Sequence, residues 1–203
     1  MDYLTLAIAT GRTSKQAMKL LEKAGLNFPD YHNKSRKLVI YDETKTGKLI
    51  FVKTADLTTY VEKGAADIGV IGKDTIMEVQ PDVYELVDLN LGKCQVVVAG
   101  FPTQKMQNGA PLTVATKYPL ITKAFFDRKG IRVETIKLNG SIELAPLIGL
   151  SDVIVDIVET GTTLKENGLV ILDKIVDISA RLIVNKASFA TKTNQIDKFI
   201  SKV

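Results

Sequence analysis

The feature that most constrains this chain is a regular alternation between short β-branched runs and stretches whose apolar residues recur at helical spacing. A strand is predicted over 4–9, followed by a helix with apolar positions from Ala17 to Ala24. The second half repeats this order, with strands over 112–115 and 131–138 on either side of a helix over 119–128. Such alternation is typical of α/β proteins with parallel sheets. The sequence therefore predicts a mainly parallel α/β fold.

Two local patterns add detail to this fold. Residues 37–41 and 48–53 have strand-like composition and flank a polar turn that ends at Gly47, which predicts a hairpin. Asn185 precedes a segment with helical spacing, so one last helix is expected from Asn185 to about Lys202. We favour two lobes over one continuous sheet, although no shift in composition marks the boundary.

The cysteine and histidine content excludes disulfide-stabilised and zinc-binding classes. The 203-residue chain has one cysteine, Cys94, and one histidine, His32. It cannot build an internal disulfide framework or a His/Cys zinc cluster within one chain. The longest apolar runs are far too short to span a bilayer, and the N-terminus lacks the basic region of a signal peptide. A cytoplasmic protein with no membrane partner is expected.

The chain is basic, with a net charge of +4 and an isoelectric point near 9.0, which favours polyanionic partners. Its basic residues are scattered, it has no tryptophan, and neither an aromatic RNA-binding motif nor a zinc finger is visible. No nucleic-acid partner is therefore expected. Small phosphorylated substrates fit the charge, and so does an ordinary solvated surface.

The segment from Val153 to Leu164 contains the most chemical information. A buried strand is predicted to lead into two acids, Asp156 and Glu159, and then into a turn and a helix. The turn consists of glycine and hydroxyl-bearing residues: Thr160, Gly161, Thr162 and Thr163. A helix N-terminus exposes backbone N–H groups that favour a phosphate, and glycine lets the backbone approach it closely. An acid at the strand end is well placed for ribose hydroxyls or a metal-bound sugar.

This pattern alone leaves more than one interpretation open. A strand followed by an N-capped helix gives the same Thr-Gly-x-Thr sequence without any ligand. The two acids favour a phosphorylated ribose. Type I phosphoribosyltransferases, however, use a similar arrangement of strand, acids and Thr-Gly-x-Thr, so the local pattern does not choose between phosphoribosyltransferase families.

The wider sequence resembles one family, the ATP phosphoribosyltransferases, which catalyse the first step of histidine biosynthesis. The family signature is matched at each of its fixed positions: Glu143, Gly149, Ser151, Ile154, Asp156, Ile157, Thr160, Gly161, Thr163 and Leu164. Further blocks resemble the family in the same order: 10–12, 35–38, 60–74, 114–119, 138–146 and 179–185. Each block is weak alone, but the collinear set covers nearly the whole chain and is specific.

The resemblance implies a two-lobed α/β fold similar to that of type II periplasmic binding proteins, with the active site in the cleft between the lobes. Lobe I is expected to comprise residues 1–94 and 178–203, and lobe II residues 95–177. The resemblance is to the short form of the family, which lacks the histidine-binding regulatory domain of longer members. Short-form subunits work with a separate regulatory subunit related to histidyl-tRNA synthetase, so a hetero-oligomer is expected.

The resemblance also implies roles for individual residues. The loop that would hold the 5-phosphate and ribose of phosphoribosyl pyrophosphate contains Asp156, Glu159, Thr160, Gly161, Thr162 and Thr163. Arg12 and Arg36 match arginines near the pyrophosphate and are the expected catalytic residues. Asp74 matches a position close to the bound nucleotide. Lys53 and Glu143 are further candidates for substrate contact.

Two positions depart from the family pattern. Thr10 stands where lysine is frequent, and Lys53 where arginine is frequent. Lysine is a poorer bidentate clamp than arginine, so one cationic contact is lost and another weakened. Some candidates also have simpler interpretations: Arg12 and Arg36 as surface charges, and Glu143 as a helix cap.

The implied reaction transfers the 5-phosphoribosyl group from phosphoribosyl pyrophosphate to N1 of ATP and releases pyrophosphate. N1 already has a lone pair, so the demanding event is departure of the charged pyrophosphate, which guanidinium groups and Mg²⁺ stabilise. Mg²⁺ is expected through the substrate phosphates, with no metal ligand from the protein. Two alternatives stay open: a type I-like phosphoribosyltransferase for a free base, and a non-catalytic two-lobed protein that binds small molecules.

Overall fold

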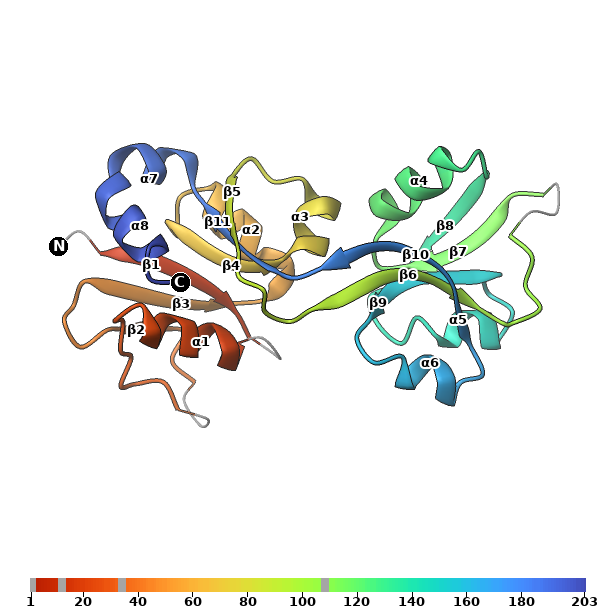
Figure 1. Cartoon of the computed structure of the whole chain (residues 1–203), viewed down its shortest axis with the longest axis horizontal. Helices are drawn as coiled ribbons and strands as arrows, with labels where there is room; N and C mark the ends of the chain where they lie inside the picture. The colour runs from red at the N-terminus through yellow and green to blue at the C-terminus, as the bar shows by residue number, and fades with distance from the viewer. Residues whose placement is uncertain (1–2, 11–13, 33–35, 107–109) are drawn as a thin grey trace. The chain divides into compact units, whose positions relative to one another are not determined.

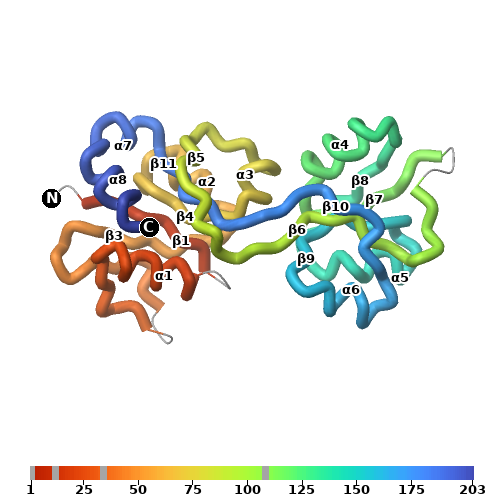
Figure 2. Tube along the Cα trace, viewed as in Figure 1, coloured from red at the N-terminus to blue at the C-terminus, as the bar shows by residue number. Residues whose placement is uncertain are grey.

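The computed structural model describes residues 3–10, 14–32, 36–106 and 110–203, and the chain divides into two compact units. Unit 1 comprises Met1–Gly92 and Ser179–Val203, and unit 2 comprises Lys93–Ile178. The chain passes from unit 1 into unit 2 and back again, so the second unit is an insertion within the first (Figure 2). No helix in the described ranges has the length and apolar character needed to cross a membrane.

The sheet of unit 1 combines strands from both ends of the chain (Figure 1). Its strand order is β2-β3-β1-β4-β11-β5. The strands are β1 (Leu4–Ala9), β2 (Val39–Tyr41), β3 (Gly47–Val52), β4 (Ile68–Gly72), β5 (Tyr84–Asp88) and β11 (Ala180–Val184). β1 pairs in parallel with β3 and β4, and the predicted hairpin is confirmed as the antiparallel pair β2–β3. The carboxyl ends of β3, β1 and β4 therefore share one edge.

Alternation of side chains along the strands gives this sheet two apolar faces, each covered by helices. Leu6 and Ile8 of β1 pack in the cluster that contains α1 and α8. Ala7 and Ala9 pack in the opposite cluster, with α2 and part of α3. The helices of unit 1 are α1 (Ser14–Lys23), α2 (Thr54–Glu62), α3 (Lys73–Val79), α7 (Lys186–Thr191) and α8 (Thr193–Ile200).

Unit 2 contains a second sheet, with strand order β10-β6-β9-β7-β8. Its strands are β6 (Cys94–Gly100), β7 (Leu112–Thr116), β8 (Val133–Lys137), β9 (Val153–Val158) and β10 (Val170–Ile178). Its helices are α4 (Pro119–Arg128), α5 (Leu144–Leu147) and α6 (Thr162–Glu166). Val97 and Ile154 of the sheet pack with Ala145 of α5 and Leu164 of α6. Figure 1 shows α4 on the opposite face of this sheet.

The mainly parallel arrangement predicted from the alternation is wrong, because both sheets are mixed. Among the described residues, four strand pairs are parallel and five are antiparallel. One antiparallel pair is the hairpin, and the others involve β6, β10 or β11. A segment that leaves unit 1 and a segment that returns to it run in opposite directions, so strands beside one another there pair antiparallel. The α/β class itself is confirmed.

The C-terminal segment forms two helices instead of the single one predicted. α7 and α8 meet at Lys192, whose φ of −121° and ψ of 26° lie outside the helical region. The Lys192 ammonium donates to Asp67 Oδ2 (3.0 Å) and to the Tyr3 carbonyl (2.9 Å), which holds this break against the core. The predicted cap is confirmed, since Asn185 Oδ1 accepts from the Ser188 amide at 2.9 Å.

Both connections between the units are hydrogen-bonded within unit 1. The Ala180 amide donates to the Leu91 carbonyl (2.8 Å), and Ser179 Oγ donates to Asp88 Oδ1 (2.7 Å). The Ser179 carbonyl accepts from the Lys73 amide at 3.0 Å. These contacts join the first turn of α3 to the places where the chain leaves and re-enters unit 1.

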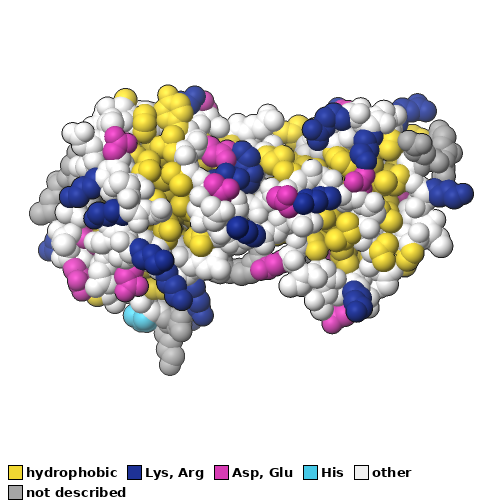
Figure 3. Space-filling view, in the orientation of Figure 1, with side chains coloured by type: hydrophobic (Ala, Val, Ile, Leu, Met, Phe, Trp, Pro, Cys, Tyr) yellow, Lys and Arg dark blue, Asp and Glu magenta, His cyan; other side chains and the backbone are white. Residues whose placement is uncertain are grey.

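Charged side chains extend this connection. Arg181 Nη2 lies 3.0 Å from Asp88 Oδ2, and Arg181 Nε lies 3.6 Å from Glu85 Oε1. Lys73 Nζ lies 2.5 Å from Glu85 Oε2. Figure 3 shows acidic and basic side chains side by side on this part of unit 1. We call Lys73, Glu85, Asp88, Ser179 and Arg181 the crossing network.

Candidate functional site

One edge of the unit 1 sheet carries three of the positions singled out in the sequence. β3, β1 and β4 are adjacent and parallel, so their carboxyl ends lie at the same edge. Thr10 follows β1, Lys53 follows β3, and Asp74 lies in the first turn of the helix after β4. The Thr10 amide donates to the Val52 carbonyl at 2.9 Å, which places the ends of β1 and β3 level. In open α/β sheets, ligands bind at this edge.

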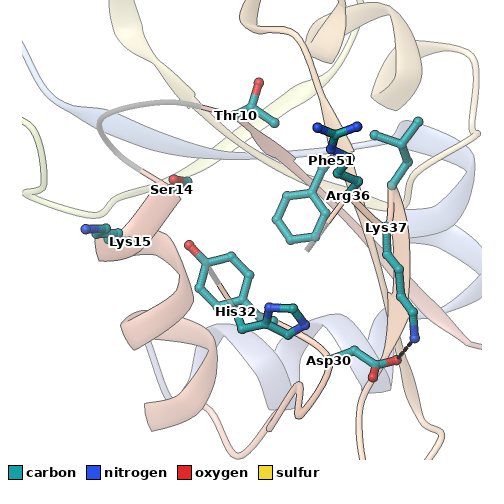
Figure 4. Close-up of a pocket in the computed structure, with 10 residues that line it drawn as sticks. Thr10, Ser14, Lys15, Asp30, His32, Arg36, Lys37 and Phe51 are labelled. Atoms are coloured by element: carbon teal, nitrogen blue, oxygen red, sulfur yellow. Dashed lines mark hydrogen bonds and ion pairs between the residues drawn. The ribbon is translucent and has the colours of Figure 1, made fainter. Parts of the chain in front are cut away.

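A pocket of about 280 Å³ opens beside the end of β1 (Figure 4). Its lining comes from Thr10, from the start of α1, from two segments before β2, and from Phe51 on β3. Arg36 lies in the second of these segments and is exposed. Figure 4 shows Arg36, Lys15 and His32 around the pocket, each from a different part of the chain. The fold therefore places a predicted catalytic arginine in a concave site.

The pocket has an excess of positive charge. Lys15, Arg36 and Lys37 line it, together with the acid Asp30. Asp30 Oδ2 accepts from Lys37 Nζ at 2.7 Å, so this acid offsets one of the three cations. The remaining positive charge attracts anions, and phosphoryl groups are among the anions that lysine and arginine bind with strong hydrogen bonds.

Contacts on both flanks hold the segments that line the pocket. The Phe51 amide donates to the Leu38 carbonyl at 2.9 Å. The Tyr31 ring stacks on Phe51 with centroids 5.8 Å apart and planes at 17°. Phe28 is buried in the cluster that α1 covers. Residues that are distant in the sequence are thus fixed against β3 and the core.

Asp74 is buried at the start of α3, with 8% of its surface exposed. A carboxylate in the first turn of a helix is stabilised by the helix dipole, which accounts for an acid here without a ligand. Its Oδ1 lies beside Gly72, where the Cβ of any other residue would overlap it. Glycine at this position therefore lets the carboxylate fold back over the end of β4.

In unit 2, the predicted phosphate loop joins β9 to α6. Gly161 is the N-cap of α6 and has a φ of +76°, a left-handed conformation that glycine adopts without steric penalty. Thr160 Oγ1 lies 3.0 Å from Thr162 Oγ1 and accepts from the Thr162 amide at 3.4 Å. Thr163 is exposed in the first turn. The first N–H groups of a helix have no intrahelical partners, so this turn presents donors to an anion.

The two acids before this turn differ in exposure. Asp156 is half-buried on β9, and its Oδ1 accepts from the Ile157 amide at 2.8 Å. Glu159 is exposed beyond the end of the strand. Within the described ranges, no three His, Cys, Asp or Glu side chains gather closely enough to hold a metal ion. The loop therefore places two carboxylates beside backbone and hydroxyl donors.

Glu143 lies on the same side of the unit 2 sheet as the loop. It is half-buried and occupies the N-cap position of α5, as the helix-cap interpretation expects, but its side chain makes no cap hydrogen bond. Its neighbours Ile142 and Ala145 pack in one apolar cluster with Leu164 of α6. This packing fixes α5 against the helix that the loop begins.

The structure thus gathers the predicted residues into a group in each unit. In unit 2, the loop over 156–163 is contiguous and shares its sheet face with Glu143. In unit 1, Arg36 shares a pocket with Thr10, whereas Lys53 and Asp74 are at the same sheet edge but not among the described residues that line it. Arg12 lies outside the described residues.

Comparison with known proteins identifies the family. Residues 53–203 match the family model described as ATP phosphoribosyltransferase. An ATP phosphoribosyltransferase of Oceanobacillus iheyensis is 52% identical over 203 residues, which covers 100% of this chain and 98% of the relative. The chain belongs to the ATP phosphoribosyltransferase family. A second member, from Clostridioides difficile, is 53% identical over 201 residues, 98% of this chain and 96% of the relative.

Solved structures agree with this membership. A chain of the ATP phosphoribosyl transferase (HisG:HisZ) complex from Thermotoga maritima superimposes with a TM-score of 0.85 at 36% identity, covering 98% of this chain and 96% of that chain. The alkanesulfonate-binding protein SsuA from Xanthomonas axonopodis pv. citri gives a TM-score of 0.61 at 10% identity, over 98% of this chain and 72% of that chain. The second likeness shows the fold alone. It confirms the two-lobed fold of periplasmic binding proteins implied by the family resemblance.

The family pattern points to Arg36 but not to several residues that share its pocket. Lys15, Tyr31, His32 and Phe51 line the pocket with it. The sequence gives little indication that these residues share a site, because they come from a helix, a loop and a strand that meet only in the folded chain. The one clue in the sequence is position, because Lys15 lies in the first turn of the helix that follows β1, next to the sheet edge where ligands are expected.

Proposed function

We propose that this chain transfers the 5-phosphoribosyl group of phosphoribosyl pyrophosphate to N1 of ATP and releases pyrophosphate, the first step of histidine biosynthesis. One observation carries the proposal: the similarity to ATP phosphoribosyltransferases extends over the whole chain at 52% identity. A free-base phosphoribosyltransferase would share the loop, and a binding protein the fold, but neither accounts for this full-length similarity. The cytoplasm is the compartment that supplies both substrates.

Unit 2, which we take as lobe II, is proposed to bind the phosphoribosyl group. The 5-phosphate would accept hydrogen bonds from the first-turn amides of α6 and from the Thr160, Thr162 and Thr163 hydroxyls. Gly161 supports this role because its left-handed φ turns the backbone there without a side chain between it and the ligand. Asp156 and Glu159 would accept from ribose hydroxyls, and Glu143 would contact substrate from α5.

Unit 1, which we take as lobe I, is proposed to bind the pyrophosphate and the nucleotide. Arg36 in its basic pocket, with Arg12, would stabilise the negative charge that develops as pyrophosphate leaves. Removing one such donor typically lowers the rate by about 10²–10³. Lys53 and Asp74, at the ends of β3 and β4, would contact the substrates from the same sheet edge. No protein base is required, because N1 of adenine already carries a lone pair.

Mg²⁺ is proposed to reach the site with the substrate phosphates. Mg²⁺ keeps several waters and binds through one or two carboxylates plus phosphate oxygens, so a dedicated cluster of acids is not required. Asp156 and Glu159 are oxygen donors of the kind that it prefers. When bound, the ion would neutralise part of the pyrophosphate charge.

A separate regulatory subunit related to histidyl-tRNA synthetase is proposed as the partner in a hetero-oligomer. Support comes from the similar Thermotoga maritima chain, which was solved in a HisG:HisZ complex. The subunit alone is expected to turn over slowly and to ignore histidine. The complex is expected to be faster and to be inhibited by histidine, which is a coupling between two distinct sites.

The direct test incubates the purified chain with ATP, phosphoribosyl pyrophosphate and Mg²⁺ and follows the absorbance of the product. The assay is run with and without the synthetase-like subunit, and with and without histidine. Product formation in the complex supports the proposal. Absence of product in an assembled complex would overturn it, while strong histidine inhibition of the lone chain would overturn the regulatory part.

A further inference from the structure

The only histidine of the chain lines the same pocket as Arg36, although nothing in the family pattern assigns it a role. His32 and Lys15 come from different elements, the loop after α1 and the first turn of α1. Both are among the residues that line the pocket with Arg36, and Figure 4 shows His32 beside Asp30 and Lys15 at the start of α1. Figure 3 shows the histidine at the surface of unit 1, near lysine or arginine side chains. Solvent and ligands can therefore reach it.

The size and charge of the pocket indicate a compact anion. Its volume of about 280 Å³ lies at the lower end of the roughly 300–1,000 Å³ of ligand sites in proteins, which suits a compact ligand. Lys15 and Arg36 supply cations, and Ser14 supplies a hydroxyl at the start of a ten-residue helix whose N-terminus favours negative charge. A pair of linked phosphoryl groups matches this combination of size and charge.

We propose that Lys15 and His32 bind pyrophosphate in this pocket together with Arg36, and that His32 does so as the imidazolium ion. This inference rests on the proposed function, since pyrophosphate is the leaving group of that reaction. An imidazolium donates from both ring nitrogens and adds a positive charge next to the ligand, whereas neutral imidazole donates from one. Pyrophosphate retention would therefore weaken as the pH rises through the range in which imidazole loses its proton.

The charged groups around His32 make this dependence specific to one side chain. The pocket presents Lys15 from α1, Asp30 from the same loop, and Arg36 and Lys37 from the segment before β2. Lysine and arginine stay protonated, and aspartate stays ionised, between pH 6 and 8. Among these groups, imidazole is the one whose charge changes over that interval.

The first experiment uses the single histidine as a spectroscopic probe. A chain with one histidine gives one set of imidazole signals in its NMR spectrum. Inorganic pyrophosphate added to the full chain is expected to shift these signals and to raise the pH at which they titrate, because a bound anion stabilises the imidazolium. Arg36→Ala is expected to reduce the effect. Imidazole signals that stay in place at saturating pyrophosphate, with binding established by calorimetry, would overturn the proposal.

The second experiment compares variants in the complex with the regulatory subunit. Lys15→Ala and His32→Gln are each expected to weaken product inhibition by pyrophosphate about three- to tenfold at pH 6.5, as for exposed contacts with a multiply charged group. Between pH 6 and pH 8, inhibition by pyrophosphate should weaken more in the wild type than in His32→Gln. The change in pyrophosphate ionisation affects both proteins equally, so the difference reports on His32. Lys19→Ala is the matched control, since Lys19 is exposed on the same helix but does not line this pocket.

The outcomes separate this inference from the reaction on which it rests. If Arg36→Ala loses turnover while Lys15→Ala and His32→Gln both match Lys19→Ala, the two added pyrophosphate contacts are refuted and the proposed reaction stands. If the wild-type complex forms no product, the proposed function fails. If calorimetry shows in addition no binding of pyrophosphate to the folded wild-type chain, the pocket inference fails independently of activity.

Discussion

Replacing Asp67 is expected to destabilise unit 1 while leaving the substrate-binding residues in place. Asp67 is only 5% exposed and lies in a block shared with the family, between α2 and β4. Its Oδ2 accepts from the Thr5 amide (2.7 Å) and from Lys192 Nζ (3.0 Å), and its Oδ1 accepts from Ser188 Oγ (2.6 Å). One carboxylate thus ties the first strand to both C-terminal helices.

The contacts set the size of the effect. A hydrogen bond to a charged group contributes about 1.5–3 kcal/mol, and removing one partner of a buried ion pair costs about 3–5 kcal/mol. The three contacts share one carboxylate, so their contributions do not add. Lys192 retains the Tyr3 carbonyl at 2.9 Å and is 19% exposed in its side chain, which limits the loss. We therefore expect Asp67→Ala to lower the free energy of unfolding by about 3–4 kcal/mol.

Urea unfolding followed by circular dichroism measures this change. Asp197→Ala is the matched control, because Asp197 is an exposed acid on α8 and its loss should stay within about 0.5 kcal/mol. A double-mutant cycle with Lys192→Met isolates the ion pair from the other two contacts. A loss below about 1 kcal/mol for Asp67→Ala would refute the reasoning, because surface carboxylates reach that value. Turnover well below the melting temperature should be unchanged.

Three shorter predictions concern the loop, the hairpin and the crossing network. Calorimetry should show weaker phosphoribosyl pyrophosphate binding for Gly161→Val than for Thr163→Ala. Gly161→Asn, which tolerates a left-handed φ, separates backbone conformation from close approach, and unchanged binding by folded Gly161→Val would remove the loop assignment. Burial raises the pKa of Asp42, but hydrogen bonds from its own turn bring it below its ordinary value. The stability from Asp42 is therefore present above the pKa of an unfolded aspartate and lost as the pH falls through the lower folded value, so Asp42→Asn should flatten the acid side of a plot of urea midpoint against pH. Arg181→Met should raise KM for ATP more than it lowers kcat, and Arg181→Lys should restore part of the wild-type KM. An unchanged KM for ATP in Arg181→Met would show that the crossing network does not affect the nucleotide site.

Elements that depend on neighbours in the sequence were predictable, whereas those that depend on distant contacts were not. The strand over 4–9 and the helix over 119–128 coincide with β1 and α4, because a continuous apolar run and a 3.6-residue period are local properties. The break at Lys192 depends on Asp67, which is 125 residues away in the sequence. No local sequence pattern could have predicted this helix break. The antiparallel pairs other than the hairpin were not predicted for the same reason, since they involve the strands at which the chain enters or leaves unit 2.

The same distinction applies to the candidate site. The loop over 156–163 is one contiguous segment, so its glycine, hydroxyls and acids can be recognised in the sequence as a phosphate-binding pattern. The pocket of unit 1 is assembled from residues that the chain separates, and its members Lys15 and His32 read in the sequence as an ordinary helix start and a surface loop. The packing of Tyr31 on Phe51, the bond from Phe51 to Leu38 and the ion pair between Lys37 and Asp30 hold these segments beside that of Arg36.

Regulation by a separate subunit requires that a contact outside the substrate-binding residues change their position. The insertion of unit 2 offers a physical route, because the chain leaves and re-enters unit 1 beside the first turn of α3. The Ser179 carbonyl accepts from the Lys73 amide at 3.0 Å, and the next residue is Asp74. A change in backbone conformation at Ser179 therefore alters the hydrogen bond that sets the start of this helix. Arg181 pairs with Glu85, which in turn pairs with Lys73 at the start of the same helix. We therefore expect a partner that biases either connection to act on Asp74 without touching it, which is the differential effect that a regulator must have.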